Sequence, residues 1–279
     1  MTHVTRRGHW RLALDGDGCK DMSESGLWLV GIGPGCLENM STRAITAAKT
    51  ADHRFLEGYT SILPQDSLEK LEGIIGSWEL RMRTSIENPD NLLSLAKREK
   101  VALLIVGDPL QATTHVDLQL RCEEEGVRCE IVHGISITTI ATGAVGLQSY
   151  RFGRQCTFAY PYGDYLPTSP LEIILSNRER DLHTLALLDL DPTGSGEGDQ
   201  QPMQPLAAMD VLRKMANRLD VDVEEWCIVL CSDMGTADTK IVSGTPKQIA
   251  AIEGGRIHCL VIPASLHDVE AAAIQRWRL

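Results

Sequence analysis

The segment 101–110 reads Val-Ala-Leu-Leu-Ile-Val-Gly-Asp-Pro-Leu, an apolar run that stops at Gly107-Asp108-Pro109. Such an unbroken run of branched apolar residues is typical of a strand that is buried on both faces, as in a parallel sheet. In open α/β sheets, small ligands bind in the crevice just beyond the carboxyl ends of the strands. The segment therefore predicts a buried parallel strand, with Asp108 placed where its carboxylate can meet a ligand.

A second strand ending of this type lies near the start of the chain, where Leu27-Trp-Leu-Val30 runs into Gly31-Ile-Gly-Pro-Gly35. Glycines let the backbone turn sharply and approach a ligand closely, so the loop is either a cradle for a nucleotide-like group or a tight turn without a ligand. The dinucleotide fingerprint requires a glycine where Cys36 stands, but Glu57 imitates the ribose-binding acid of that fingerprint. A nicotinamide site therefore remains an alternative.

Strand-like and helix-like segments alternate along the chain. Strands are expected at 27–31, 51–57, 101–106, 127–132, 155–159, 184–188, 226–231, 240–243 and 257–262. Helices are expected at 41–50, 67–75, 91–97, 114–126, 136–146, 170–178, 205–219 and 246–252. The alternation predicts an α/β fold of two domains, 27–133 and 134–279, with a mostly parallel sheet in the first, a mixed sheet in the second and a ligand cleft between them. The segment 191–205 is rich in Gly, Pro, Gln and Asp, which predicts an exposed loop or linker.

Composition narrows the class of protein. The 279 residues are 43% hydrophobic and 23% charged, an ordinary globular balance, and the formal net charge of −11 argues against nonspecific binding of nucleic acid. No apolar stretch is long enough to span a bilayer, and no secretory signal core is found, so we expect a cytoplasmic protein. The eight cysteines form no C-x-x-C pair, which predicts neither a structural zinc nor a disulfide framework, and no metal is expected.

The first 26 residues precede the first credible strand. We expect residues 1–26 to form a disordered N-terminal extension, because they lack an apolar core. A second hypothesis is that translation begins at Met22, just ahead of that strand.

Four longer strings carry a resemblance to a known family. They read Leu-Glu-Gly-Tyr-Thr-Ser-Ile-Leu at 56–63, Val-Gly-Asp-Pro-Leu-Gln-Ala-Thr-Thr-His at 106–115, Gly-Leu-Gln-Ser-Tyr-Arg-Phe-Gly at 146–153 and His-Thr-Leu-Ala-Leu-Leu-Asp-Leu at 183–190. In these strings the chain resembles the diphthine synthases, which belong to the tetrapyrrole-methylase-like group of S-adenosylmethionine enzymes. The short linker after Asp191 resembles that of the archaeal type.

The resemblance implies a fold, an activity and a site. It implies two α/β domains of the tetrapyrrole methylase type with the cofactor cleft between them, and a homodimer. It also implies an enzyme of diphthamide biosynthesis that uses S-adenosylmethionine and repeatedly methylates the amino group of an aminocarboxypropyl-modified histidine of translation elongation factor 2, forming diphthine. Carried over by position, the cofactor contacts are Pro34, Asp108, Gln111, Ser136, Ile137, Leu188, Met234 and His258. No residue is assigned as a general base.

Two alternatives stay open. Pro34 stands where the family usually has Leu or Gly, and the Gly-x-Gly-Pro-Gly form of the first loop is closer to that of precorrin methyltransferases. The chain could therefore methylate a tetrapyrrole with the same cofactor. It could also be a noncatalytic nucleotide-sensing or assembly module, because a fold alone does not prove catalysis.

Overall fold

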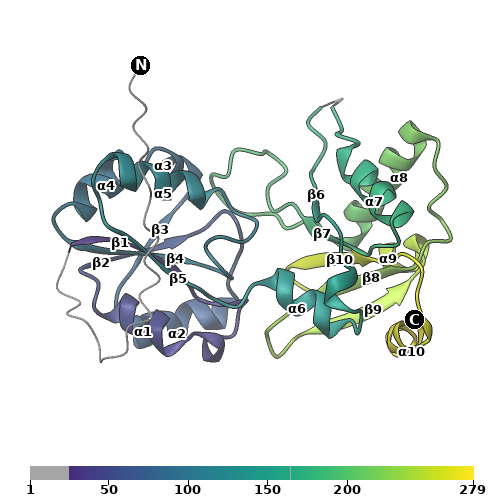
Figure 1. Cartoon of the computed structure of the whole chain (residues 1–279), viewed down its shortest axis with the longest axis horizontal. Helices are drawn as coiled ribbons and strands as arrows, with labels where there is room; N and C mark the ends of the chain where they lie inside the picture. The colour runs from purple at the N-terminus through teal and green to yellow at the C-terminus, as the bar shows by residue number, and fades with distance from the viewer. Residues whose placement is uncertain (1–24, 164) are drawn as a thin grey trace, which may run out of the picture.

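The computed structural model describes residues 25–163 and 165–279. Two five-stranded sheets lie side by side, and each is covered on both faces by helices (Figure 1). We call each sheet with its covering helices a lobe. The predicted α/β class is confirmed. The expectations for the N-terminal extension and for a start at Met22 concern residues that lie almost entirely outside the described part of the chain.

The first lobe is built on a parallel sheet in the order β3-β2-β4-β1-β5. Its strands are β1 (Gly26–Gly31), β2 (His53–Glu57), β3 (Glu79–Arg81), β4 (Lys100–Ile105) and β5 (Cys129–Val132). The helices α1 (Thr42–Lys49) and α2 (Gln65–Ile75) cover one face, and α3 (Arg83–Glu87), α4 (Asp90–Ala96) and α5 (His115–Glu124) cover the other (Figure 1).

Burial on both faces explains the apolar sequence of the central strands. In β1, Trp28 and Val30 pack toward α1 and α2, whereas Leu27 and Leu29 pack toward α4 and α5. Successive side chains of a strand point to opposite faces, so a strand between two helical layers needs apolar residues at every position. The same holds for β4, all of whose residues are buried and, after Lys100, apolar.

The second lobe is built on a mixed sheet in the order β6-β7-β10-β8-β9, in which only the β6–β7 pair is parallel. Its strands are β6 (Cys156–Phe158), β7 (Thr184–Leu188), β8 (Ile228–Ser232), β9 (Lys240–Gly244) and β10 (His258–Ile262). One face is covered by α7 (Ser169–Glu179), α8 (Pro205–Leu219) and α9 (Pro246–Ala250), and the other by α6 (Ile137–Ala144) and α10 (Asp268–Gln275). The predicted mixed sheet is confirmed.

Three elements were not expected from the sequence. β3 has three residues and lies at the sheet edge, α3 has five residues, and α10 shows little amphipathic pattern because only Glu270 and Ile274 are buried in it. Segments this short or weakly patterned do not reach the periodicity by which elements are recognised.

The segment 191–205 differs from the exposed linker that its composition predicts. Asp191 is buried, and its carboxylate accepts hydrogen bonds from the Thr193 and Gly196 amides at 2.8 and 2.7 Å. Met203 is fully buried in the core of the second lobe. The segment is therefore an anchored loop, because its polar groups satisfy one another rather than facing only water.

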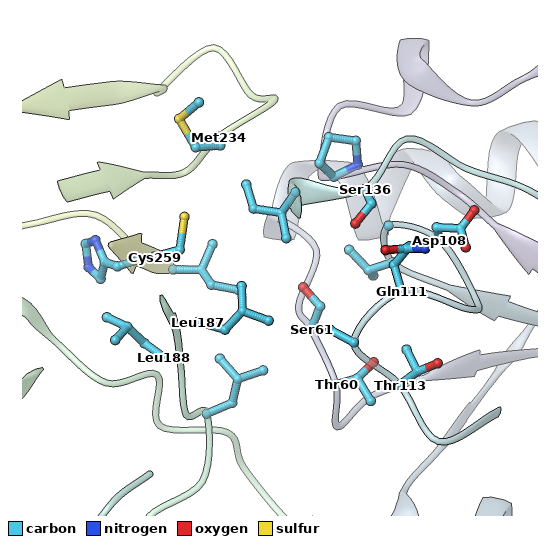
Figure 2. A pocket seen from close by; sticks show the side chains of 18 of the residues that line it. Thr60, Ser61, Asp108, Gln111, Thr113, Ser136, Leu187, Leu188, Met234 and Cys259 are labelled. Atoms are coloured by element: carbon cyan, nitrogen blue, oxygen red, sulfur yellow. The ribbon is translucent and has the colours of Figure 1, made fainter. Parts of the chain in front are cut away.

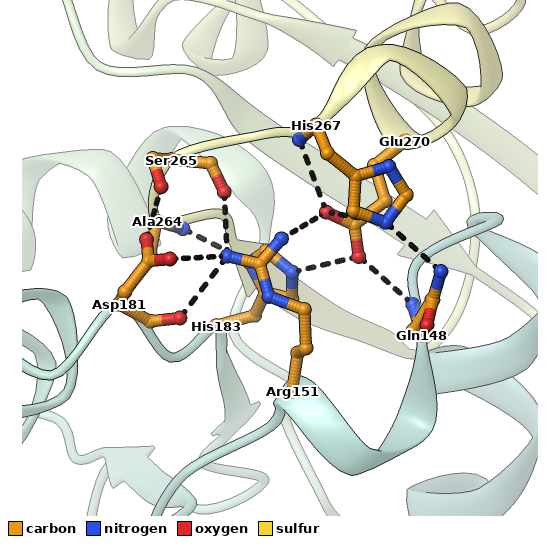
Figure 3. A network of polar contacts seen from close by, with 8 residues as sticks. All are labelled: Gln148, Arg151, Asp181, His183, Ala264, Ser265, His267 and Glu270. Atoms are coloured by element: carbon orange, nitrogen blue, oxygen red, sulfur yellow. Dashed lines mark hydrogen bonds and ion pairs between the residues drawn. The ribbon is translucent and has the colours of Figure 1, made fainter.

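The string at 146–153 has a structural explanation in a buried ion-pair network (Figure 3). The guanidinium of Arg151 pairs with the fully buried carboxylate of Glu270 in α10 and with Asp181. His183 Nε2 contacts the other oxygen of Glu270 at 3.2 Å, and the Gln148 amide donates to that same oxygen at 3.1 Å. This network fastens α10 onto the second sheet.

Candidate functional site

One cavity lies between the two lobes, at the carboxyl ends of β1 and β4 on one side and at β7, β8 and β10 on the other (Figure 2). It encloses about 800 Å³ of space, the open solvent at its mouth included. We call it the first cavity. All eight residues expected to contact a cofactor line it: Pro34, Asp108, Gln111, Ser136, Ile137, Leu188, Met234 and His258.

Three glycines bring the strand ends of the first lobe together beside this cavity. A Cβ on Gly31 would lie 2.5 Å from the Gly134 amide nitrogen, and a Cβ on Gly134 would lie 2.2 Å from the Gly107 carbonyl oxygen. Gly107 has a φ of 86° and pairs with Gly33 through two backbone hydrogen bonds. The glycines that suggested a ligand cradle are therefore first a requirement of backbone packing.

Asp108 ties these strand ends to one another. Its Oδ1 accepts from the Leu110 amide at 2.9 Å, and its Oδ2 accepts from the Gly134 amide at 3.2 Å and contacts His133 Nδ1 at 2.8 Å. A carboxylate oxygen can accept more than one hydrogen bond, so Oδ1 retains capacity for a ligand. Asp108 is thus a structural anchor as well as a lining residue.

The amino end of α6 faces the same cavity. Ser136 caps the helix and accepts from the Thr138 amide at 3.2 Å, and the Thr138 hydroxyl donates to Ser136 Oγ at 2.9 Å. The first amides of a helix carry partial positive charge and favour an anionic or carbonyl group. Ser136 and Ile137 therefore offer backbone donors beside an apolar side chain.

His258 contributes a buried polar atom that lacks a partner in the protein. Its Nδ1 lies 2.8 Å from the Ser232 hydroxyl, and its Nε2 is buried with no hydrogen-bond partner. Burial lowers the pKa of His258, and the negative charge of Asp233 only partly opposes this. The ring is therefore neutral at pH 7, and its Nε2 can exchange a hydrogen bond with a ligand.

The second lobe supplies most of the apolar lining. Leu187, Leu188, Met234 and Cys259 stand opposite the polar side chains of Thr60, Ser61, Gln111 and Ser136 (Figure 2). Thr60, Ser61, Thr113 and Leu187 were not assigned from the sequence, although Thr60 and Ser61 lie in the string 56–63. A cavity with one apolar and one polar wall suits a ligand that carries a flat ring and several polar groups.

Glu57 does not line the first cavity, so the nicotinamide interpretation of this residue is wrong. It is buried at the end of β2, where Thr60 donates to its Oε2 at 2.9 Å and His115 Nε2 lies 3.6 Å from that oxygen. Burial raises the pKa of Glu57 to about 8, and the hydrogen bonds from Thr60 oppose that rise. Burial also lowers the pKa of His115, so at neutral pH this is mainly an uncharged pair.

Residues 26–250 match the family of Tetrapyrrole (Corrin/Porphyrin) Methylases. A diphthine synthase of Methanoregula boonei is 34% identical over 90% of this chain and 98% of its own length, and one of Halorubrum lacusprofundi is 34% identical over 89% and 95%. The chain belongs to the diphthine synthase family. A crystal structure of a putative diphthine synthase from Entamoeba histolytica has a TM-score of 0.80 and 32% identity, and covers 91% of this chain and 99% of its own.

No helix among the described residues is long and apolar enough to cross a membrane, and no group of three or more His, Cys, Asp or Glu among them could hold a metal ion. The seven described cysteines are all free thiols.

Proposed function

We propose that this chain is a methyltransferase of diphthamide biosynthesis that uses S-adenosylmethionine to form diphthine on translation elongation factor 2. The observation that carries the proposal is the first cavity, because the eight residues that match the family's cofactor contacts all line it. Membership of the diphthine synthase family over nearly all of the described chain supports the substrate. It also disfavours the precorrin alternative, which rested on the first loop alone.

The lining of the first cavity fits S-adenosylmethionine. Leu188, Met234 and Ile137 offer apolar surface for a purine ring, and His258 Nε2 and the capped end of α6 offer hydrogen bonds to its polar groups. Asp108 retains an acceptor site for an ammonium or a hydroxyl group. When bound, the cofactor supplies a methyl group on a positively charged sulfur.

Methyl transfer to an amine requires the protein mainly to position the two reacting atoms. Methyl transfer to an amine is an in-line displacement, in which the leaving sulfide departs without a proton, so holding the reacting atoms at about 3–3.5 Å supplies much of the rate. The attacking nitrogen must first lose its ammonium proton, and a cavity that excludes water favours this loss by destabilising the charged form. The first cavity, with one wall from each lobe, can both position the reacting atoms and exclude water.

The test uses labelled S-adenosylmethionine and elongation factor 2 that carries the unmethylated aminocarboxypropyl histidine. We expect a stepwise gain of methyl mass on that one peptide. Transfer to a precorrin instead would establish the alternative substrate. Binding of the cofactor with no transfer to either acceptor would indicate the noncatalytic module.

We also propose a cytoplasmic homodimer, by analogy with the archaeal type, and a domain boundary at residues 133–134, in the connection between β5 and α6. Light scattering of the purified chain tests the dimer, since a monomer mass at micromolar concentration contradicts it. Separate expression of residues 134–279 tests the boundary.

A further inference from the structure

A second cavity adjoins the first. Its lining includes Tyr59, Arg83, Glu87 and Gln155, and it shares Thr60, Ala112, Thr113 and Leu187 with the first cavity. The shared residues form a neck between the two. We propose that this second cavity binds the α-amino carboxylate end of the acceptor side chain, with Arg83 holding the carboxylate and the amine directed through the neck toward the methyl group. The inference rests on the proposed function and adds the acceptor site to it.

The two cavities differ in the charged residues that line them. Arg83 and Glu87 are the charged residues among the described lining of the second cavity, with Arg83 Nε and Glu87 Oε1 3.6 Å apart. The first cavity has no Lys or Arg in its described lining, and its one carboxylate, Asp108, would repel an anion. Of the two cavities, the second is therefore the one whose described lining offers a cation to a carboxylate.

Arg83 is held in position but keeps donors free. Its Nη1 donates to the Gly194 carbonyl oxygen at 2.9 Å, and its guanidinium carbon lies 5.3 Å from the centre of the Tyr59 ring. Its Nε is buried and has no hydrogen-bond partner. Because a guanidinium has five N–H donors in a planar fork, the remaining donors match a carboxylate.

The loop that holds Arg83 comes from the other lobe. The Arg83 amide donates to the Gly196 carbonyl at 3.2 Å, and the Thr84 amide donates to Glu197 at 2.7 Å. The buried carboxylate of Asp191 organises this loop. Burial alone would raise the pKa of Asp191, but hydrogen bonds from Thr193, Gly196 and Ser195 outweigh it and lower the pKa to about 2. Arg83 is thus fixed between the lobes by an anchored loop.

The neck combines a strained backbone residue with two threonine side chains. Ala112 has a φ of 56°, a left-handed conformation that is strained for a residue other than glycine and that clusters at functional sites. Thr60 and Thr113 line the neck, and the Thr60 hydroxyl donates a hydrogen bond to Glu57 Oε2. Figure 2 shows Thr60 and Thr113 together at one end of the first cavity, away from Met234. The Thr60 oxygen is therefore free to accept from an amine in the neck.

The experiment compares Arg83→Ala, Arg83→Lys and the control Arg81→Ala in steady-state methylation of modified elongation factor 2. Arg81 is a matched control, since its side chain is 38% exposed like that of Arg83, but it pairs with Glu79 and lines neither cavity. We expect Arg83→Ala to raise KM for the elongation factor by about tenfold or more. Arg83→Lys should raise KM by less, because it keeps the charge and loses the fork.

The dissociation constant of S-adenosylmethionine, measured by calorimetry, is expected to stay within about twofold of wild type in all three variants. A KM for the elongation factor that is the same in Arg83→Ala as in Arg81→Ala, while wild type transfers methyl groups normally, overturns the acceptor site and leaves the proposed function intact. A wild-type chain that binds the cofactor but transfers no methyl group refutes the proposed function, and the acceptor site with it.

Discussion

At the scale of single residues, Gly134 and Gly143 allow the effect of tight backbone packing near the first cavity to be tested. Gly134 follows β5, and no room exists for a side chain between it and the Gly107 carbonyl. Gly143 lies within α6, six residues after Ile137 of the same cavity wall, and a Cβ there would meet nothing within 4 Å. Substituting alanine at both positions therefore compares a site where two backbone segments touch, next to the first cavity, with a site where a methyl group has room.

We predict that Gly134→Ala destabilises the protein by about 1–3 kcal/mol, because the added methyl group must displace backbone atoms of a well-packed region. It should also weaken binding of S-adenosylmethionine, since Asp108 bonds to the Gly134 amide. Gly143→Ala should instead stabilise the protein by about 0.5–1 kcal/mol through helix propensity. Thermal unfolding and calorimetric titration measure both effects. Equal melting temperatures for the two variants would contradict the prediction.

At the scale of elements, α10 depends on one buried carboxylate. Glu270 is fully buried, and its partners Arg151, His183 and Gln148 come from elsewhere in the second lobe. We predict that Glu270→Ala lowers the free energy of unfolding by about 3–5 kcal/mol, because it breaks the buried ion pair with Arg151 and leaves the Gln148 amide and His183 Nε2 without their acceptor. Asp268→Ala, on the exposed face of the same helix, should cost no more than about 1 kcal/mol. Chemical denaturation of both variants gives the comparison.

The same network predicts how stability depends on pH. Burial lowers the pKa of His183, and Glu270 also has a lowered pKa because hydrogen bonds from Gln148 and His183 outweigh the effect of burial. A lowered pKa means that the unfolded state binds protons more readily, so the free energy of unfolding falls as the pH falls. The His183 contribution is lost below about pH 6.5, and that of Glu270 below about pH 4.3.

The buried rings of His115 and His258 act in the same direction as His183, because burial lowers their pKa values too. Glu57 acts in the opposite direction, because burial raises its pKa to about 8, so the histidine effect is measured as a difference between two proteins. Urea unfolding of the wild type and of His183→Gln at pH 7.5, 6.5 and 5.5 should show the stability advantage of the wild type shrinking as the pH falls. An advantage that grows between pH 7.5 and 5.5 would exclude a neutral buried His183.

At the scale of the whole molecule, the predictable part of this chain is the part that rests on strand ends. Asp108 is found from an apolar run that stops abruptly, whereas Leu188 came from the family resemblance alone, and strand ends of two sheets face each other across the first cavity. Arg83 was not found, because its backbone partner Gly194 belongs to the other lobe and the contact arises only when the lobes meet. The anchored loop was not found, because Asp191 bonds to amides of its own loop, and a polar, glycine-rich composition does not show that these groups satisfy one another.

The two lobes also meet on the side of the first cavity formed by Pro34. Gly235 packs against Pro34, and its carbonyl oxygen accepts from the Cys36 amide at 3.1 Å. A Cβ on Gly235 would lie 2.3 Å from Pro34 Cγ, whereas one on Gly254 would meet nothing within 4 Å. The two glycines have φ values of 80° and 81°, so alanine pays the same backbone cost at either position.

We predict that Gly235→Ala weakens binding of S-adenosylmethionine by about tenfold or more relative to Gly254→Ala, although both lose similar backbone stability. The reason is that the methyl group pushes Pro34 and the loop around Met234 apart, and both line the cavity. Calorimetric titration gives the affinities, and small-angle scattering reports whether the lobes separate. Equal affinities in the two variants would mean that contact between the lobes at Pro34 does not shape the cofactor site, and that the walls of the first cavity act independently.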